Sequence, residues 1–130
     1  EPDSAACVLE SIKTSKIEKI SIDKESIMGG MSCGEVSLVP WEILRNSVNF
    51  CVTVSDDYIS KTVKYLANKG FSDEKIVGGE CSTPGITSLV GMCNDIKIRE
   101  KINLNENSNI LLFGCEGDAD EELYQKLLNE

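Results

Sequence analysis

The most constraining feature of this chain is an apolar run that leads directly into a small polar turn and an acidic helix start. The apolar run covers residues 110–113, the Gly-Cys-Glu-Gly turn covers residues 114–117, and the acidic segment Asp-Ala-Asp-Glu-Glu covers residues 118–122. In an α/β protein this order is typical of a buried strand that delivers a turn to the carboxyl edge of a sheet, where ligands bind.

The same alternation of strand and helix patterns occurs three times in the second half of the chain. It predicts strands near residues 50–55, 75–78 and 109–113, and helices near residues 56–69, 84–99 and 118–129. The connections are short enough to be right-handed crossovers between parallel strands. The pattern therefore predicts a three-layer α/β fold with a mostly parallel sheet.

The first 47 residues give weaker signals. Apolar and β-branched residues predict short strands at 5–12 and 17–22. Residues 26–40 contain Gly29, Gly30 and Gly34 and read as a loop with a short helical turn, and a short helix is expected at residues 41–47, just after Pro40.

Size and charge exclude several classes of protein. With 130 residues the chain is expected to form a single domain over residues 1–130, or part of one. Its 22 acidic and 13 basic residues give a net charge of −9, so no nucleic-acid partner is expected. No apolar run is long enough to span a membrane and no signal peptide is visible, which favours a cytoplasmic protein without a membrane partner.

The six cysteines do not form a recognisable metal or catalytic pattern. The chain has no Cys-x-x-Cys pair and no histidine, so it cannot supply a Cys/His zinc site or a Cys-His nucleophile pair. Cys51 and Cys93 lie among apolar residues, where cysteine usually acts as a small hydrophobic side chain. No metal site is expected.

Three glycine-containing turns could bring backbone N–H groups to an anion: residues 29–30, 78–79 and 114–117. None of them matches a dinucleotide or phosphate-loop fingerprint. Taken alone, each is more often a tight turn than a ligand site.

Taken together, three segments resemble a known family: Cys33-Gly34-Glu35, Trp41-Glu42-Ile43-Leu44-Arg45 and Glu116-Gly117-Asp118-Ala119-Asp120. They resemble the C-terminal third of the diaminopropionate ammonia-lyases, which are pyridoxal-phosphate enzymes of fold type II. The resemblance implies a C-terminal fragment of a larger, homodimeric enzyme. That enzyme would use pyridoxal phosphate to eliminate ammonia from the amino acid 2,3-diaminopropionate and give pyruvate.

The resemblance also implies roles for three residues. Cys115 stands where the wider group places a serine or threonine that meets the pyridine nitrogen of the cofactor, Gly30 where a glycine passes close to the ring, and Glu80 in a turn near the cofactor. Without the resemblance, structural interpretations are favoured: Glu80 as an acidic residue that caps the following helix, and Cys115 as a buried thiol at the end of a strand. With the resemblance, a structural role and cofactor proximity are equally favoured for Glu80. The Schiff-base lysine and phosphate loop of the family lie upstream of the matching part, so this chain alone is expected to be inactive.

Two other readings stay open. One is another fold type II enzyme, related to threonine dehydratase or threonine synthase. The other is a non-catalytic acidic α/β module that binds a partner. The resemblance also raises the question of a Cys7–Cys33 disulfide, although two free thiols are the expectation for a cytosolic protein.

Overall fold

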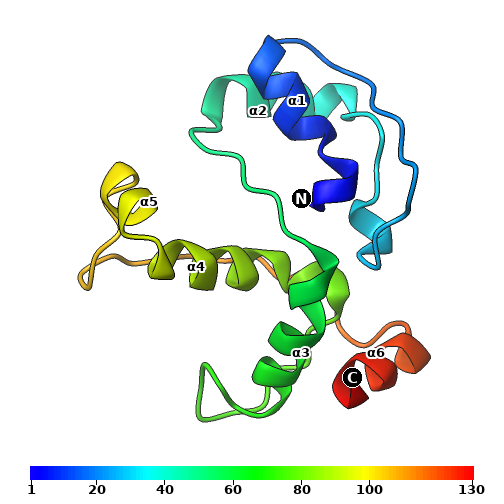
Figure 1. Ribbon diagram of the computed structural model, residues 1–130, viewed down its shortest axis with the longest axis vertical. Coiled ribbons are helices and arrows are strands. Elements are labelled where there is room, and N and C mark those ends of the chain that lie inside the picture. The colour runs from blue at the N-terminus through cyan, green and yellow to red at the C-terminus, as the bar shows by residue number, and fades with distance from the viewer. The chain divides into compact units, whose positions relative to one another are not determined.

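The computed structural model describes all 130 residues, and the chain divides into two compact units, residues 1–56 and residues 57–130 (Figure 1). Helices are joined by long extended segments, and no β-sheet is present. The only strand-like pairings are two isolated bridges, Pro2–Val54 and Lys19–Glu35. The predicted three-layer α/β sheet fold is therefore wrong for this chain.

Unit 1 packs two α-helices around a small apolar core. Its elements are the 3-10 turn η1 (Asp3–Ala5), helix α1 (Cys7–Thr14), the 3-10 turn η2 (Gly29–Met31) and helix α2 (Leu38–Ser47). Cys7, Val36 and Trp41 are buried together, and Val8, Ile12, Ile17, Ile20 and Leu44 pack against them. The loop with a helical turn predicted at 26–40 and the helix predicted at 41–47 are confirmed, although α2 begins three residues earlier, inside the loop.

Residues 5–12, predicted as a strand, form most of η1 and α1 instead. The carboxylate of Glu1 accepts hydrogen bonds from the backbone N–H groups of Val8 (3.1 Å) and Leu9 (2.7 Å), at the open end of α1. Cys7 and Ser11, one helical turn apart, are both buried. A short apolar run does not distinguish the helical repeat of about 3.6 residues from the strand repeat of 2. Here the Glu1 carboxylate, which lies outside the run, caps the first turn and favours the helix.

Unit 2 is built on the packing of α3 (Ile59–Ala67) against α6 (Glu121–Asn129). The 3-10 turn η3 (Asp56–Tyr58) leads into α3. Five side chains form the buried core of this unit: Ile59, Val63, Leu66, Tyr124 and Leu127. The Ser60 hydroxyl donates to the Leu127 carbonyl oxygen at 2.9 Å and ties the two helices together. The helices predicted at 56–69 and 118–129 are confirmed.

The remaining elements of unit 2 are the 3-10 turn η4 (Glu80–Ser82), helix α4 (Pro84–Asn94) and helix α5 (Ile96–Lys101). The single helix predicted at 84–99 is thus two helices. Asp95 separates them: its backbone is extended, and its side chain accepts the N–H groups of Lys97 and Ile98. The Thr62 and Thr87 hydroxyl groups, 2.8 Å apart, link α3 to α4.

The predicted strands at 17–22, 50–55, 75–78 and 109–113 form no sheet. A strand needs an adjacent strand to satisfy its backbone groups, and residues 109–113 have no backbone hydrogen bond at all. In Figure 1, the chain turns after α5 and then runs back along α4 towards α6. The apolar pattern predicted strands at these positions, and no strand forms there.

Two further expectations concern membranes and disulfides. The longest helix, α4, has 11 residues, so no helix of this chain could cross a bilayer. All six cysteines are free, including Cys7 and Cys33. Burial, with a smaller effect of the Glu1 charge, raises the pKa of the Cys7 thiol and keeps it in its unreactive form.

Candidate functional site

The densest polar contact of unit 2 joins two turns that are 34 residues apart in the sequence, and we call it the turn clasp. It holds Glu116 against residues 79–82. The Glu116 carbonyl oxygen accepts the Gly79 N–H at 3.2 Å and a short hydrogen bond from the Ser82 hydroxyl, while the Glu116 N–H donates to Ser82 Oγ at 2.7 Å. The carboxylate of Glu116 accepts the Cys81 N–H at 2.9 Å. The clasp therefore fixes the residue that follows Cys115.

Gly79 is required for this close approach. A Cβ atom at position 79 would collide with the backbone oxygen of Gly117 and lie 3.0 Å from a carboxylate oxygen of Glu116. The backbone of Gly79 is extended, so its role is to leave space rather than to adopt a left-handed conformation. The glycine-containing turns predicted at 78–79 and 114–117 are thus packed directly on each other.

Glu80 lies behind the clasp and is only 9% exposed. Burial raises the pKa of its carboxyl group, and the nearby charges of Glu116 and Asp120 add to the rise. A carboxyl group in this setting holds its proton to a higher pH than an exposed one.

One group of side chains in the chain could hold a metal ion: Glu80, Cys81 and Glu116, whose donor atoms lie within 4.8 Å of one another. The Glu116 carboxylate already accepts the Cys81 N–H, and Glu80 faces Glu116. Acidic groups in such contact are common without a metal, and we assign none here.

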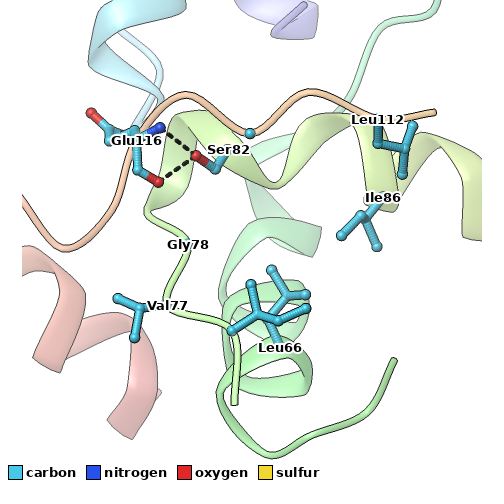
Figure 2. A pocket seen from close by; sticks show the side chains of 9 residues that line it. Leu66, Val77, Gly78, Ser82, Ile86, Leu112 and Glu116 are labelled. Atoms are coloured by element: carbon cyan, nitrogen blue, oxygen red, sulfur yellow. Dashed lines mark hydrogen bonds between the residues drawn. The ribbon is translucent and has the colours of Figure 1, made fainter. Parts of the chain in front are cut away.

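A hollow of about 250 Å³ lies beside the clasp. Figure 2 shows Ser82 and Glu116 with their two hydrogen bonds on one side of it, Ile86 and Leu112 on another, and Leu66 and Val77 below. Apolar side chains from α3, α4 and two extended segments form most of its wall. The full lining comprises Leu66, Ile76, Val77, Gly78, Ser82, Ile86, Leu112, Gly114 and Glu116.

The three residues singled out in the sequence are distributed over the two units. Glu80 and Cys115 both belong to unit 2, on the two sides of the turn clasp, whereas Gly30 belongs to unit 1 and lies in η2. Cys115 is exposed, between two residues that line the hollow, and Gly30 is exposed as well. The alternative of a buried thiol at position 115 is therefore wrong.

Ser82 was not singled out in the sequence, although it makes two of the clasp's hydrogen bonds. The sequence shows Cys-Ser-Thr-Pro at a helix start, where a serine or threonine usually caps the following helix. Nothing local pairs position 82 with position 116. Glu116 appeared in the sequence only as part of the Gly-Cys-Glu-Gly turn and of the Glu116–Asp120 segment that carries the resemblance.

Comparison with known proteins gives consistent matches. No family model matches the chain. The chain is 30% identical over 133 residues to the diaminopropionate ammonia-lyase of Escherichia coli strain K12, a match that covers 100% of this chain and 33% of that protein. The diaminopropionate ammonia-lyase of Salmonella typhimurium strain LT2 is 23% identical over 134 residues, covering 98% of this chain and 33% of that protein.

Solved structures agree with the sequence matches. The crystal structure of the E. coli lyase in complex with an aminoacrylate-PLP azomethine reaction intermediate aligns with a TM-score of 0.85 and 29% identity, covering 98% of this chain and 33% of that one. The same lyase in complex with D-serine aligns with a TM-score of 0.84 at 29% identity, over 98% of this chain and 32% of that one. This chain thus spans about a third of the length of the relatives it matches.

Proposed function

We propose that this chain, homologous over its whole length to a third of the diaminopropionate ammonia-lyases, forms the C-terminal part of a pyridoxal-phosphate-dependent enzyme with that activity. The enzyme would convert 2,3-diaminopropionate and water to pyruvate and two molecules of ammonia. The observation that carries the proposal is the agreement of sequence and backbone over 98% of the chain at a TM-score of 0.85. The homodimer and the cytoplasmic location expected of the whole enzyme stay predictions.

We propose roles at the cofactor for three residues of this chain. Cys115 presents an exposed thiol in a turn whose next residue is held by the clasp. We propose that this thiol meets the pyridine nitrogen, and that Gly30, which has no side chain and is exposed, lets the ring pass close to the backbone. Glu80 acts as a positioning residue, because its carboxyl group faces Glu116, which adjoins Cys115.

We infer that the rest of the cofactor site lies outside this chain. No lysine of the chain is buried, so none lies in the enclosed setting that a Schiff-base lysine requires. We assign the lysine and the phosphate-binding loop to the two thirds of the relatives that this chain does not match. Pyridoxal phosphate, when bound, supplies the electron sink for the elimination, and a neutral partner at its ring nitrogen favours elimination over transamination.

The alternatives receive less support. The relatives and solved structures described above are diaminopropionate ammonia-lyases, which favours this activity over that of a threonine dehydratase or synthase. No observation favours a non-catalytic binding module.

A chimera tests the proposal. The E. coli lyase is produced with its matching third replaced by residues 1–130 of this chain, and pyruvate release from 2,3-diaminopropionate is measured. We expect turnover with added pyridoxal phosphate, and none from this chain alone. In the chimera, Cys115→Ala should lower kcat by about tenfold, the value of one hydrogen bond of about 1.4 kcal/mol, and Cys115→Ser should restore it. A folded, cofactor-loaded chimera that releases no pyruvate would refute the proposal.

A further inference from the structure

The Asp56 carboxylate fastens a loop of unit 1 that lies 30 residues earlier in the sequence. Asp56 Oδ1 accepts the Ser26 hydroxyl at 2.5 Å, and Asp56 Oδ2 accepts the Ile27 N–H at 3.0 Å. Ser26 Oγ in turn accepts the Met28 N–H at 3.0 Å. We call these three hydrogen bonds the loop lock. Because hydrogen bonds to an ionised group are stronger than neutral ones, a carboxylate that accepts two of them from adjacent residues fixes the position of that segment.

The loop lock acts directly before the turn η2, which carries two adjacent glycines. Ser26 and Met28 are buried, 6% and 0% exposed, whereas Gly29 and Gly30 are exposed. Two adjacent glycines cost more backbone entropy to order than other residues do. The lock and the buried Met28 side chain therefore anchor one side of the loop and leave the glycine backbone open to a ligand.

The contacts and backbone angles of this chain do not account for the glycines. No glycine of the chain has a positive φ, so a left-handed backbone is not the reason for either of them. A Cβ atom added at position 29 would meet no atom within 4 Å. A close approach by a ligand would account for them, and the proposed function supplies one, since the cofactor ring is proposed to pass the backbone of Gly30.

Asp56 extends from a backbone that is itself held in place. Two residues earlier, Val54 is buried and pairs with the first residues of the chain. The Val54 N–H donates to the Glu1 carbonyl oxygen at 2.9 Å, and the Asp3 N–H donates to the Val54 carbonyl oxygen at 3.0 Å. The carboxylate thus has a fixed origin from which it can hold the loop.

We propose that Asp56 is a positioning residue for the cofactor: through Ser26 and Ile27 it holds the turn of Gly29 and Gly30 in the position against which the ring of pyridoxal phosphate packs. The inference rests on the proposed function for the identity of the ligand. Asp56 acts through the loop and contacts neither the cofactor nor the substrate.

Hydrogen exchange in the chain alone tests the lock without the cofactor. Asp56→Ala should raise the exchange rates of the Ile27 and Met28 amides by at least about tenfold, because Ile27 loses its acceptor and the Ser26 hydroxyl loses the group that orients it. Glu25→Ala removes the same charge from an exposed side chain beside the loop and is the matched control. Its exchange rates should stay within about twofold of those of the unchanged chain.

The chimera described above tests the consequence for the cofactor. Asp56→Ala should raise the Kd for pyridoxal phosphate by at least about tenfold, the value of one hydrogen bond to a charged group. It should also weaken the circular dichroism of the bound cofactor at saturation, because the ring loses its single orientation. Ser26→Ala should act in the same direction, and Asp56→Asn, which keeps one acceptor oxygen, should recover part of the affinity. Glu25→Ala should match the unchanged chimera.

Three outcomes would overturn the proposal. The first is unchanged exchange of Ile27 and Met28 in Asp56→Ala. The second is a pair of folded chimeras, Asp56→Ala and Ser26→Ala, that bind the cofactor with unchanged affinity and unchanged circular dichroism. The third is a loss of thermal stability without any change in the circular dichroism of the bound cofactor, which would make Asp56 purely structural. If Asp56→Ala does not fold, Ser26→Ala and Asp56→Asn decide.

The readouts separate this inference from the proposed function. A chimera that binds pyridoxal phosphate, depends on Asp56 for its orientation and releases no pyruvate would refute the activity alone. An active chimera whose bound cofactor is indifferent to Asp56→Ala would refute the positioning role alone.

Discussion

At the level of single residues, the turn clasp explains why glycine occupies position 79. Its absent side chain lets the 79–82 turn approach Gly117 closely enough for Glu116 to accept two N–H groups and a hydroxyl. The contact is local in space and distant in sequence, so a change at position 79 disturbs both turns.

Gly79→Ala should therefore lower the free energy of unfolding of the chain by about 2–4 kcal/mol, through overpacking and loss of the clasp hydrogen bonds. Urea unfolding measures this. Gly91→Ala is the matched control: position 91 lies in α4, has no atom within 4 Å of an added Cβ, and should become more stable by about 0.5–1 kcal/mol. Equal effects of the two substitutions would contradict the role of Gly79.

Glu80 gives a second prediction at this scale, on pH dependence. Burial raises the pKa of its carboxyl group in the folded chain above the ordinary value of 4.5. The folded state then binds the proton more strongly than the unfolded state, so this contribution to stability is complete below pH 4.5 and is lost as the pH rises through the raised value. Glu80→Gln should remove this dependence.

We expect urea midpoints of Glu80→Gln and the unchanged chain to coincide near the ordinary carboxyl pKa, and the variant to be the more stable one at neutral pH. Glu106→Gln, at an exposed loop position, is the control and should leave the pH profile unchanged. A Glu80→Gln variant that is less stable at neutral pH would show that the ionised carboxylate stabilises the turn.

At the level of elements, a helix can be predicted from its own segment of sequence, whereas a strand also requires a partner elsewhere in the sequence. The start of α6 was predictable because Asp120, two glutamates and leucines at helical spacing all lie within one segment. Residues 110–113 show an equally clear apolar pattern, but strand pairing depends on residues elsewhere, and none within this chain supplies it. α1 was misread for a related reason, since its cap comes from Glu1, outside the run that was examined for periodicity.

The candidate site, too, was predictable from the sequence only in part. The turns that hold Glu80 and Cys115 were visible as glycine-containing segments after apolar runs. The contact between these turns was not visible in the sequence, because Ser82 and Glu116 meet only through the folding of α4, α5 and residues 102–115. A single sequence shows which turns are unusual but not which turns touch.

The cap of α6 gives the prediction at this scale. Asp120 accepts the Leu123 N–H at 2.9 Å, and α6 places Tyr124 and Leu127 in the core against α3. Asp120→Ala should lower the free energy of unfolding by about 1 kcal/mol, the usual cost of losing an N-cap. Asp118→Ala removes the same charge two residues earlier without removing a cap bond, and should cost less than about 0.5 kcal/mol. Thermal unfolding measures both losses of stability. Equal losses in the two variants would contradict the role of Asp120 as the cap.

At the level of the whole molecule, the chain buries two small cores and leaves its longest apolar extended segment in water. Leu111 and Phe113 are among its most exposed large hydrophobic residues. A contiguous exposed apolar patch marks an interaction site more often than a structural one. The cores of α1 with α2 and of α3 with α6 account for the folded state without it.

The double variant Leu111→Asp, Phe113→Asp should therefore change the free energy of unfolding of the isolated chain by less than about 0.5 kcal/mol, because little buried surface is lost. Urea unfolding measures this change. The same double variant should bind less of a hydrophobic dye such as ANS, since the bare face becomes charged. Val63→Asp is the contrasting control: Val63 is fully buried in unit 2, and an unpaired charge there should unfold that unit. A double variant as unstable as Val63→Asp would show that Leu111 and Phe113 pack into the isolated chain, and that residues 109–113 are part of its core.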